Sequence, residues 1–410
     1  MTVLYCYCRA PSRAAFAALC GIVVLSMSAG CQPAQRRVGP VRAIWVTRFD
    51  YETADDVVRI VEDCRRAGFN TVLFQVRGNG TAFYRSSFEP WAEQFGFADP
   101  GFDPLETAVR EAHRGGMELH AWVNVMPAWR GETPPADPEQ LYHKHPEWFW
   151  YDQYGDRQAL SSFYVSLNPC LPEVREYLVS VFREIVRDYD IDGLHMDYIR
   201  FPNEPPARPA DSDIDYPRDA RTLALYRRET GLTPADDGEA WNRWRTEQVT
   251  RLVADVHAMM RETDPEAILS AAVGTNRERS LNCFRDGERW AADGLVDAVF
   301  PMNYRDDLET FQTGLGQWLP YTEEVTVVPG LWFSPRVGPD EGISVVRQQI
   351  EAALDATGNF CVFAYSLLFD SRDDQVTRQN EKQNNTRALR RCELIPFLQS
   401  LADRDTARSP

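Results

Sequence analysis

The feature of this sequence that most constrains its fold is a regular alternation of short β-type runs with longer helical stretches. Strands that alternate with helices are typical of a parallel sheet, because each helix returns the chain to the start of the next strand. The β-type runs are Arg42–Asp50, Thr71–Arg77, Glu118–Val125, Gly193–Arg200, Ala267–Gly274, Val296–Tyr304, Thr326–Phe333 and Phe360–Leu367.

The stretches between these runs carry helix signals. Residues 54–67 have apolar side chains at three and four spacing and stop at Gly68, a helix C-cap signal. Asp103 and Pro104 stand where the N-cap and first position of a second helix are expected. Further helices are predicted in Pro172–Tyr189 and Ile343–Ala356, and a long or broken helix in Tyr216–Arg261.

Eight strand–helix units predict an α/β fold, a (β/α)8 TIM barrel with long loop insertions after strands 3 and 4. An open doubly wound sheet is the alternative, but it would place a glycine-rich phosphate turn after the first strand, where the chain has Phe49-Asp50-Tyr51. The insertion at 126–171 is rich in aromatic residues, and the one at 203–217 is rich in proline and aspartate. Both leave the ends of strands at which barrel active sites are built.

The N-terminus predicts export. An apolar run at 14–27 precedes Ser28-Ala29-Gly30-Cys31, which favours a lipoprotein signal with Cys31 as the lipidated first residue, with a plain secretory signal as the alternative. Gln32 after that cysteine favours an outer-membrane anchor facing the periplasm in a Gram-negative host. The predicted domains are a signal peptide at 1–30, a tether at 31–40, one barrel at 41–402 and a flexible tail at 403–410.

Charge and composition exclude several function classes. A net charge of −17 without a basic cluster disfavours nucleic acid as a partner. The cysteines left after the signal are scattered, so they predict no zinc site, and we expect them to be small buried apolar residues. No cofactor or metal is predicted.

Polar and aromatic residues gather at the predicted strand ends. Amides, charged groups and aromatic faces together suit a polyhydroxyl ligand. We expect Trp129 to provide a stacking platform, because it follows the end of the third strand by only a few residues. The predicted substrate-binding residues are Asp50, Arg77, His120, Asn124, Trp129, His195, Arg200, Asn303, Tyr304 and Trp332.

The run Gly193–Arg200 carries the strongest catalytic signal. Successive side chains of a strand alternate, so His195 and Asp197 share the face that points into the barrel. Asp197 is predicted to be the nucleophile or base of glycoside hydrolysis, with His195 hydrogen-bonded to its carboxylate. The alternative is that Asp197 only forms an ion pair with Arg77 or Arg48. The leading candidates for the general acid are Asp306 and Glu278, and Asp307 and Asp50 are further candidates.

Several longer motifs resemble a known family. They are Phe74-QVRGNGTAFYRSSFEPW-Ala92, Gly101-FDPLETAVREAHRGGMELHAWVN-Val125, His145-PEWFW-Tyr151, Leu167-NPCLPEVREYL-Val179 and Tyr189-DIDGLHMDYIRFP-Asn203. The chain resembles the glycosyl hydrolase-like 10 family of secreted bacterial proteins, which includes divisome-localised lipoproteins that cleave peptidoglycan glycan strands. The resemblance implies a (β/α)8 glycosidase that acts on a cell-wall glycan or a related polysaccharide. Many members have a second aspartate where this chain has Tyr198.

Three functions remain open at this point. The leading one is an exported glycoside hydrolase, and the alternative is a catalytically inactive glycan-binding barrel lipoprotein, which Tyr198 favours. A metal-dependent hydrolase would need clustered histidine and carboxylate ligands, and the six histidines offer only His143-Lys144-His145 in a loop.

Overall fold

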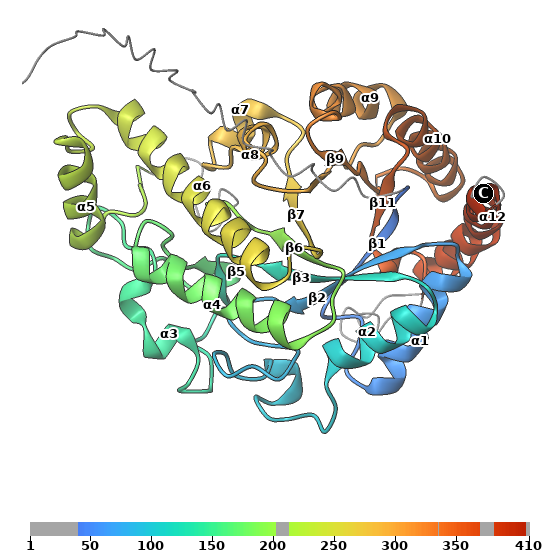
Figure 1. The fold of residues 1–410 in the computed structure, drawn as a ribbon, viewed down its shortest axis with the longest axis horizontal. Helices are drawn as coiled ribbons and strands as arrows, with labels where there is room; N and C mark the ends of the chain where they lie inside the picture. Colours follow the sequence, from blue (N-terminus) through green and yellow to red (C-terminus); the bar gives the residue numbers. More distant parts are fainter. Residues whose placement is uncertain (1–39, 202–212, 335, 370–380, 407–410) are drawn as a thin grey trace, which may run out of the picture. The chain divides into compact units, whose positions relative to one another are not determined.

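The structure is a computed structural model that describes residues 40–201, 213–334, 336–369 and 381–406 (Figure 1). The predicted signal peptide with Cys31, the tether up to residue 39 and most of the predicted loop at 203–217 lie outside the described residues. Residues 403–406, predicted to be tail, belong to the last helix. Within the described ranges, no helix has the length and apolarity needed to cross a membrane.

Each predicted strand of the barrel is confirmed, and most end somewhat earlier than predicted. The strands are parallel to their neighbours throughout. They are β1 Arg42–Val46, β2 Thr71–Arg77, β3 Glu118–Asn124, β6 Gly193–Asp197, β7 Ile268–Val273, β8 Ala298–Pro301, β9 Thr326–Val327, β10 Gly330–Trp332 and β11 Phe360–Phe363.

The barrel is closed by a single run of chain that contains both β9 and β10. The strand order is β10-β11-β1-β2-β3-β6-β7-β8-β9, so the two ends of the sheet are successive pieces of the seventh predicted strand. Pro329 separates the pieces because it has no N–H to donate. The backbone N–H of Val328 still donates to Val299, and the carbonyl of Pro329 accepts from Cys361, so this run bridges β8 and β11. The predicted (β/α)8 architecture is confirmed.

Helices surround the strands, as Figure 1 shows. Predicted caps are present: the Asp103 side chain accepts from the backbone N–H of Glu106, and Pro104 begins α2. The helix predicted over 216–261 is two helices with Gly231 at their junction, in a left-handed conformation that glycine adopts easily. The helices are α1 Ala54–Arg66, α2 Pro104–Arg114, α3 Leu141–Lys144, α4 Pro172–Asp188, α5 Ala220–Thr230, α6 Gly238–Thr263, α7 Arg277–Leu281, α8 Gly287–Ala292, α9 Leu308–Gly316, α10 Pro339–Thr357 and α12 Glu381–Thr406, with 3-10 turns at Glu93–Phe95, Pro146–Trp148, Leu319–Tyr321 and Tyr365–Leu367.

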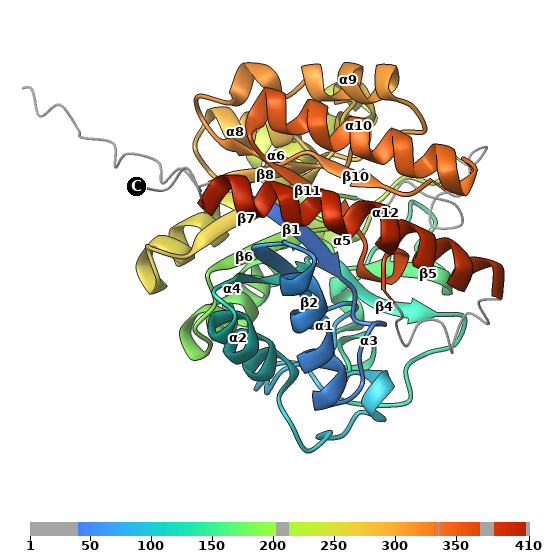
Figure 2. The same cartoon turned by 90° about the vertical axis from the view of Figure 1, so that its right-hand side faces the viewer.

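The last helix, α12, completes the outer layer. Figure 2 shows it running between α10 and α1 across the outside of the barrel. The side-chain amide of Gln399 donates to the carbonyl of Arg66 at the end of α1. Leu394 and Leu398 are buried beneath the helix. The sequence pattern did not predict this element.

Apolar side chains form one core outside the sheet and another inside the barrel. The outer core lies between strands and helices and includes Ile44 and Val46 of β1 with Val57 and Ile60 of α1. The inner core is built from the opposite faces of the strands. Its buried members are Val41, Ala43, Trp45, Leu73, Trp122, Ile268, Ala298, Phe300, Val328, Cys361 and Ala364. Of the cysteines predicted to be buried, Cys64, Cys170, Cys283 and Cys361 are, whereas Cys392 is exposed.

The insertion after β3 contains regular structure that the sequence pattern did not predict. Its strands β4 Pro127–Gly131 and β5 Ser161–Ser166 form an antiparallel pair. Arg130 lies opposite Tyr164, and Trp129 lies opposite Val165. Because side chains alternate along a strand, Arg130 and Trp129 point to opposite faces of this pair.

Candidate active site

A cavity of about 290 Å³ opens at the carboxyl ends of the barrel strands. It combines aromatic rings, amides and guanidinium groups with a carboxylate. Its lining residues are Trp45, Thr47, Arg48, Phe49, Gln75, Trp122, Asn124, Arg130, Tyr164, Asp197, Tyr198, Arg200, Ala272, Met302, Tyr304 and Phe363. Asp197 is the one acidic side chain in this set of described residues. Of the predicted site residues, the cavity brings together Asn124, Asp197, Arg200 and Tyr304.

Asp197 ends β6 beside Asn124 of β3, its direct partner in the parallel sheet. Its Oδ1 accepts a hydrogen bond of 2.6 Å from the backbone N–H of Tyr198. Tyr198 adopts a φ of 49°, in the left-handed region that a tyrosine rarely occupies. Strained backbone of this kind concentrates at functional sites, and here it stands directly after the candidate catalytic carboxylate.

His195 lies one layer below Asp197 and does not bond to it, which corrects the predicted contact between them. The indole N–H of Trp45 donates to Nε2 of His195 at 3.2 Å, and Nδ1 lies 2.9 Å from the Ser270 hydroxyl. Since Nε2 accepts, we assign the proton to Nδ1. Burial lowers the pKa of His195 well below its ordinary value, and nearby His120 lowers it further. His195 is therefore a neutral residue of the inner core.

A chain of hydrogen bonds crosses the floor of the cavity. The Gln75 amide donates to Asn124 Oδ1 at 3.1 Å, and its own oxygen accepts from the backbone N–H of Arg48 at 3.0 Å. The Asn124 amide donates to the carbonyl of Gly78 at 3.0 Å. At the other end, Arg48 Nη2 donates to the Tyr164 hydroxyl at 3.1 Å. These bonds fix the orientation of the polar groups around Asp197.

Aromatic rings form the wall opposite this floor. Tyr304 stacks on Trp332 with ring centroids 5.7 Å apart and packs against Phe363. Trp332 was predicted to bind substrate, but it does not line the cavity and instead supports Tyr304 from behind. Burial raises the pKa of Tyr304 well above its ordinary value, and the charge of Asp197 raises it further. Tyr304 thus keeps its proton and can donate a hydrogen bond to a ligand hydroxyl.

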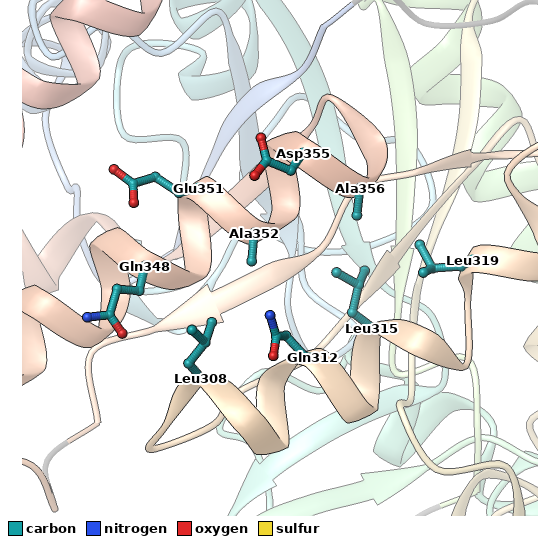
Figure 3. Close-up of a pocket in the computed structure, with 9 residues that line it drawn as sticks. All are labelled: Leu308, Gln312, Leu315, Leu319, Gln348, Glu351, Ala352, Asp355 and Ala356. Carbon is teal, nitrogen blue, oxygen red and sulfur yellow. The ribbon is translucent and has the colours of Figure 1, made fainter.

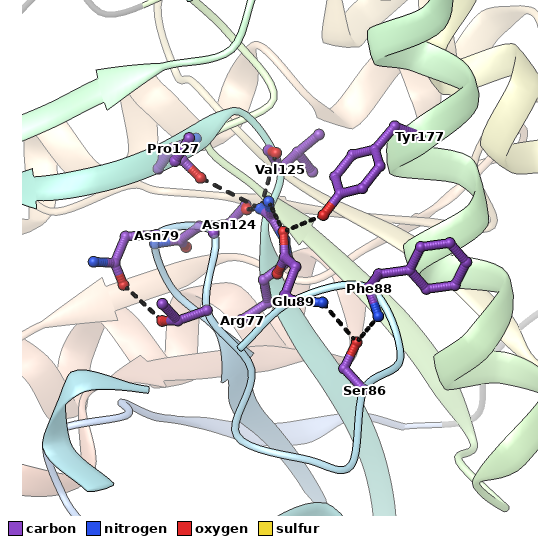
Figure 4. Close-up of polar contacts among 12 residues, drawn as sticks. Arg77, Asn79, Ser86, Phe88, Glu89, Asn124, Val125, Pro127 and Tyr177 are labelled. Carbon is purple, nitrogen blue, oxygen red and sulfur yellow. Dashed lines mark hydrogen bonds and ion pairs between the residues drawn. The ribbon is translucent and has the colours of Figure 1, made fainter. Parts of the chain in front are cut away.

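Arg77 lies outside the cavity, in a fully buried ion pair with Glu89 (Figure 4). Two of its nitrogens contact the Glu89 carboxylate, and the third donates to the carbonyls of Asn124 and Val125. Tyr177 also donates to Glu89, at 3.4 Å. The structure therefore corrects the predicted role of Arg77 from ligand contact to core ion pair. Neither Arg77 nor Arg48 pairs with Asp197, which removes the ion-pair alternative for that carboxylate.

Four other predicted ligand residues are buried away from the cavity. Asp50 accepts from the backbone N–H and hydroxyl of Thr47 in the turn after β1. Asn303 donates to the carbonyl of Phe311 in α9. His120 lies deeper in the barrel, beneath Trp122. Trp129 is only 2% exposed and donates to the carbonyl of Thr133, so it belongs to the core of the insertion.

Neither leading candidate for the general acid reaches the cavity. Asp306 forms an exposed ion pair of 2.9 Å with Arg336. Hydrogen bonds from Ser334 and Arg336 lower the pKa of Asp306. Glu278 is exposed in α7. These positions leave Asp197 as the only candidate of the three that lines the cavity.

The insertion contributes to the cavity through Arg130 and Tyr164, neither of which was predicted as a site residue. They face each other across β4 and β5. The alternation of side chains along β4 and β5 is the sequence feature that could have identified these two residues, because it places Arg130 on the face opposite Trp129. Arg48 was considered only as an ion-pair partner, yet it lines the cavity.

A second hollow, of about 570 Å³, lies between α9 and α10 on the outer layer (Figure 3). Its apolar side chains include Leu308, Leu315 and Leu319. None of the predicted site residues lines it, and it shares no lining residue with the cavity at the strand ends. Separately, the described ranges contain no group of three or more His, Cys, Asp or Glu residues that could hold a metal ion.

A closed (β/α)8 barrel with a carboxylate and aromatic rings at the carboxyl ends of its strands is an arrangement that glycosidases share. The chain belongs to the glycosyl hydrolase-like 10 family, which matches residues 40–328. It is similar to glycosyl hydrolase DigH of Escherichia coli (strain K12), with 27% identity over 67% of this chain and 69% of that protein. Glycosyl hydrolase YngK of Bacillus subtilis (strain 168) is 24% identical over 64% of this chain and 54% of that protein.

Solved structures agree on the fold. The catalytic domain of beta-amylase from Paenibacillus polymyxa matches with a TM-score of 0.56 and 10% identity, covering 80% of this chain and 93% of that chain. Alpha-L-fucosidase isoenzyme 2 from Paenibacillus thiaminolyticus matches with a TM-score of 0.53 and 14% identity, covering 80% of this chain and 46% of that chain. These solved structures bear on the fold alone. The family and the relatives named glycosyl hydrolases support a glycosidase-type function and imply a carbohydrate substrate.

Proposed function

We propose that this protein is an exported glycoside hydrolase that cleaves a glycosidic bond in a bacterial cell-wall glycan of the peptidoglycan type, or in a related polysaccharide. The observation that carries the proposal is the position of Asp197 at the carboxyl end of β6, where it is the acidic residue of an otherwise aromatic and cationic cavity. Membership of a family whose relatives are named glycosyl hydrolases supports it.

Asp197 acts in this proposal as the nucleophile or the base. Glycoside hydrolysis passes through a transition state with positive charge on the sugar ring, which a carboxylate stabilises. As a nucleophile it would bond to the anomeric carbon; as a base it would take a proton from the attacking water. The bond from the Tyr198 N–H fixes the orientation of the carboxylate at the cavity.

The remaining lining residues fit sugar recognition. The faces of Trp122 and Tyr304 offer stacking surfaces, and Asn124, Gln75 and Tyr304 carry groups that hydrogen-bond hydroxyls or acetamides. A cavity of about 290 Å³ is near the lower end of the size range of small-ligand pockets, so it would hold only a short part of a glycan. A longer strand would extend over the insertion formed by β4 and β5.

Export and anchoring form a separate part of the proposal. The apolar run at 14–27 and the Ser28-Ala29-Gly30-Cys31 ending support lipidation of Cys31 and an outer-membrane position facing the periplasm. Mass spectrometry of the mature N-terminus tests this directly. A lipid-modified Cys31 is expected, and an unmodified terminus at another residue would contradict the anchor while leaving secretion intact.

A catalytically inactive glycan-binding lipoprotein is the second candidate. The observation that favours it is that Asp197 is the one carboxylate among the described lining residues, whereas most glycosidases use two. Tyr198, where many family members have aspartate, points the same way.

Incubation of the full-length protein with purified peptidoglycan strands stripped of their peptides separates the two candidates. A hydrolase releases new reducing ends and shorter oligosaccharides that mass spectrometry resolves. An inactive binder co-sediments with the strands and leaves their length unchanged. Chitin oligomers run in parallel report whether the muramic acid residues are needed.

A further inference from the structure

Two guanidinium groups line the cavity and contact the same two aromatic rings. Arg48 lies 4.3 Å from the ring centroid of Phe49 and 5.8 Å from that of Tyr164. Arg130 lies 5.7 Å and 5.8 Å from the same two rings. Two positive charges that line the same cavity and contact the same two rings would both attract an anion bound there.

Arg48 is buried without a counter-charge. It is 3% exposed, its guanidinium donates to the neutral side chains of Gln75 and Tyr164, and its buried Nε has no hydrogen-bond partner among the described residues. No carboxylate in the described part of the chain forms an ion pair with it or with Arg130. Arg77, which is equally buried, has Glu89 as its partner. Buried charges are normally paired, and this chain carries a net charge of −17, so an unpaired buried arginine needs an explanation.

The geometry around Arg48 keeps its guanidinium in place. A Cβ atom at Gly78 would lie 2.5 Å from Arg48 Cδ and Nε, so the glycine leaves room for the side chain. Gln75 accepts from the backbone N–H of Arg48, and the Tyr164 oxygen accepts from Nη2. Because that oxygen already accepts, the Tyr164 O–H remains able to donate to a ligand.

We propose that Arg48, Arg130 and Tyr164 form a subsite for a carboxylate group on the sugar, so that the substrate is an acidic glycan. This deepens the proposed function and rests on it. The flat fork of a guanidinium matches the two oxygens of a carboxylate, and the bonds are charge-assisted. The carboxylate of a lactyl ether and that of a uronic acid share this chemistry.

Two acidic glycans and their carboxyl-reduced forms test the subsite. Peptide-free peptidoglycan oligosaccharides carry the lactyl carboxylate, and hyaluronan oligosaccharides carry that of a uronic acid. Reduction converts each carboxylate to an alcohol and leaves the linkages intact. Binding is measured by calorimetry with Asp197→Asn protein, so that substrate is not consumed.

We expect at least one acidic glycan to bind about 10- to 100-fold more tightly than its reduced form. Adding Arg48→Gln should abolish this preference. Adding Arg130→Gln should reduce it, and because Arg130 is exposed this variant tests the subsite even if the Arg48 variant does not fold. The control Arg110→Gln removes the same charge from the exposed face of α2 and should leave the preference unchanged.

Equal affinity for acidic and reduced forms, absence of binding to any of the four, or a preference that survives Arg48→Gln in a folded protein overturns the subsite. These results are distinguishable from failure of the proposed function. Equal cleavage of acidic and reduced glycans by the unsubstituted protein would leave the hydrolase in place without the subsite. A charge preference in a protein that cleaves none of them would leave the subsite in place without the hydrolase.

Discussion

Replacing Glu89 by glutamine should destabilise the barrel severely, because it leaves the Arg77 guanidinium buried without its counter-charge. Both side chains of the pair have no exposed surface, and Nε of Arg77 lies 2.9 Å from Oε2 of Glu89 (Figure 4). In the unsubstituted protein the Arg77 guanidinium bonds both carboxylate oxygens of Glu89. A glutamine at this position would offer it one neutral oxygen and one N–H donor instead.

The expected loss follows from the complete burial of both groups. Breaking a buried ion pair by removing one partner typically costs about 3–5 kcal/mol, and full burial leaves no solvent to screen the charge that remains. Domains are commonly stable by about 5–15 kcal/mol, so this loss is a large share of the total. Urea unfolding followed by far-UV circular dichroism measures it.

Glu62→Gln is the matched control. It removes the same charge from an ion pair with Arg65 and Arg66 on the surface of α1, where solvent screens the interaction. We expect this variant to unfold close to the midpoint of the unsubstituted protein. The reasoning is refuted if Glu89→Gln and Glu62→Gln shift the midpoint equally. A double variant, Arg77→Met with Glu89→Leu, should lose less stability than the single variants together, since no unpaired charge remains.

Other consequences of the structure can be measured in the same way. Trp129→Ala should lower the free energy of unfolding by about 3–5 kcal/mol, because it removes a buried indole, while glycan affinity of the folded protein stays unchanged; a loss of affinity with unchanged stability would restore the platform that the sequence predicted. Burial lowers the pKa of His195, so below about pH 6.5 the unfolded chain binds a proton that the folded chain does not. Stability from this group is therefore complete above that pH and is lost as pH falls towards the folded pKa, by at most about 1.4 kcal/mol for each pH unit. His195→Gln should remove this part of the pH dependence, and an unaltered slope in unfolding titrations would contradict the neutral assignment.

The sequence predicts the barrel well because its strands have strong local patterns. Strands such as β1 and β7 are buried along their whole length and read as nearly continuous apolar runs, which is typical of a parallel sheet. The shared face of His195 and Asp197 follows from the two-residue period alone. The role of His195 does not, because its partners Trp45 and Ser270 come from distant strands.

Errors at the site have identifiable physical causes. Between Gln75 and Arg77 the register of β2 against β3 shifts, so the regular alternation that puts Gln75 on the cavity floor does not carry over to Arg77. In the insertion, β4 is a short strand without a clear alternation, and the choice between Trp129 and Arg130 is a choice of face. Asp306 and Glu278 follow strand ends by several residues, where no periodicity fixes direction.

The central claim, that Asp197 catalyses cleavage of a bound glycan, is tested most directly by separating turnover from binding in Asp197→Asn. This substitution keeps the side-chain shape and an oxygen that can accept from the Tyr198 N–H, but it removes the charge. With peptide-free peptidoglycan strands, we predict that kcat falls by about 1,000-fold or more, as when one member of a catalytic group is removed, while Kd changes little. Turnover equal to that of the unsubstituted protein, measured as reducing ends released at saturating glycan, would contradict the account.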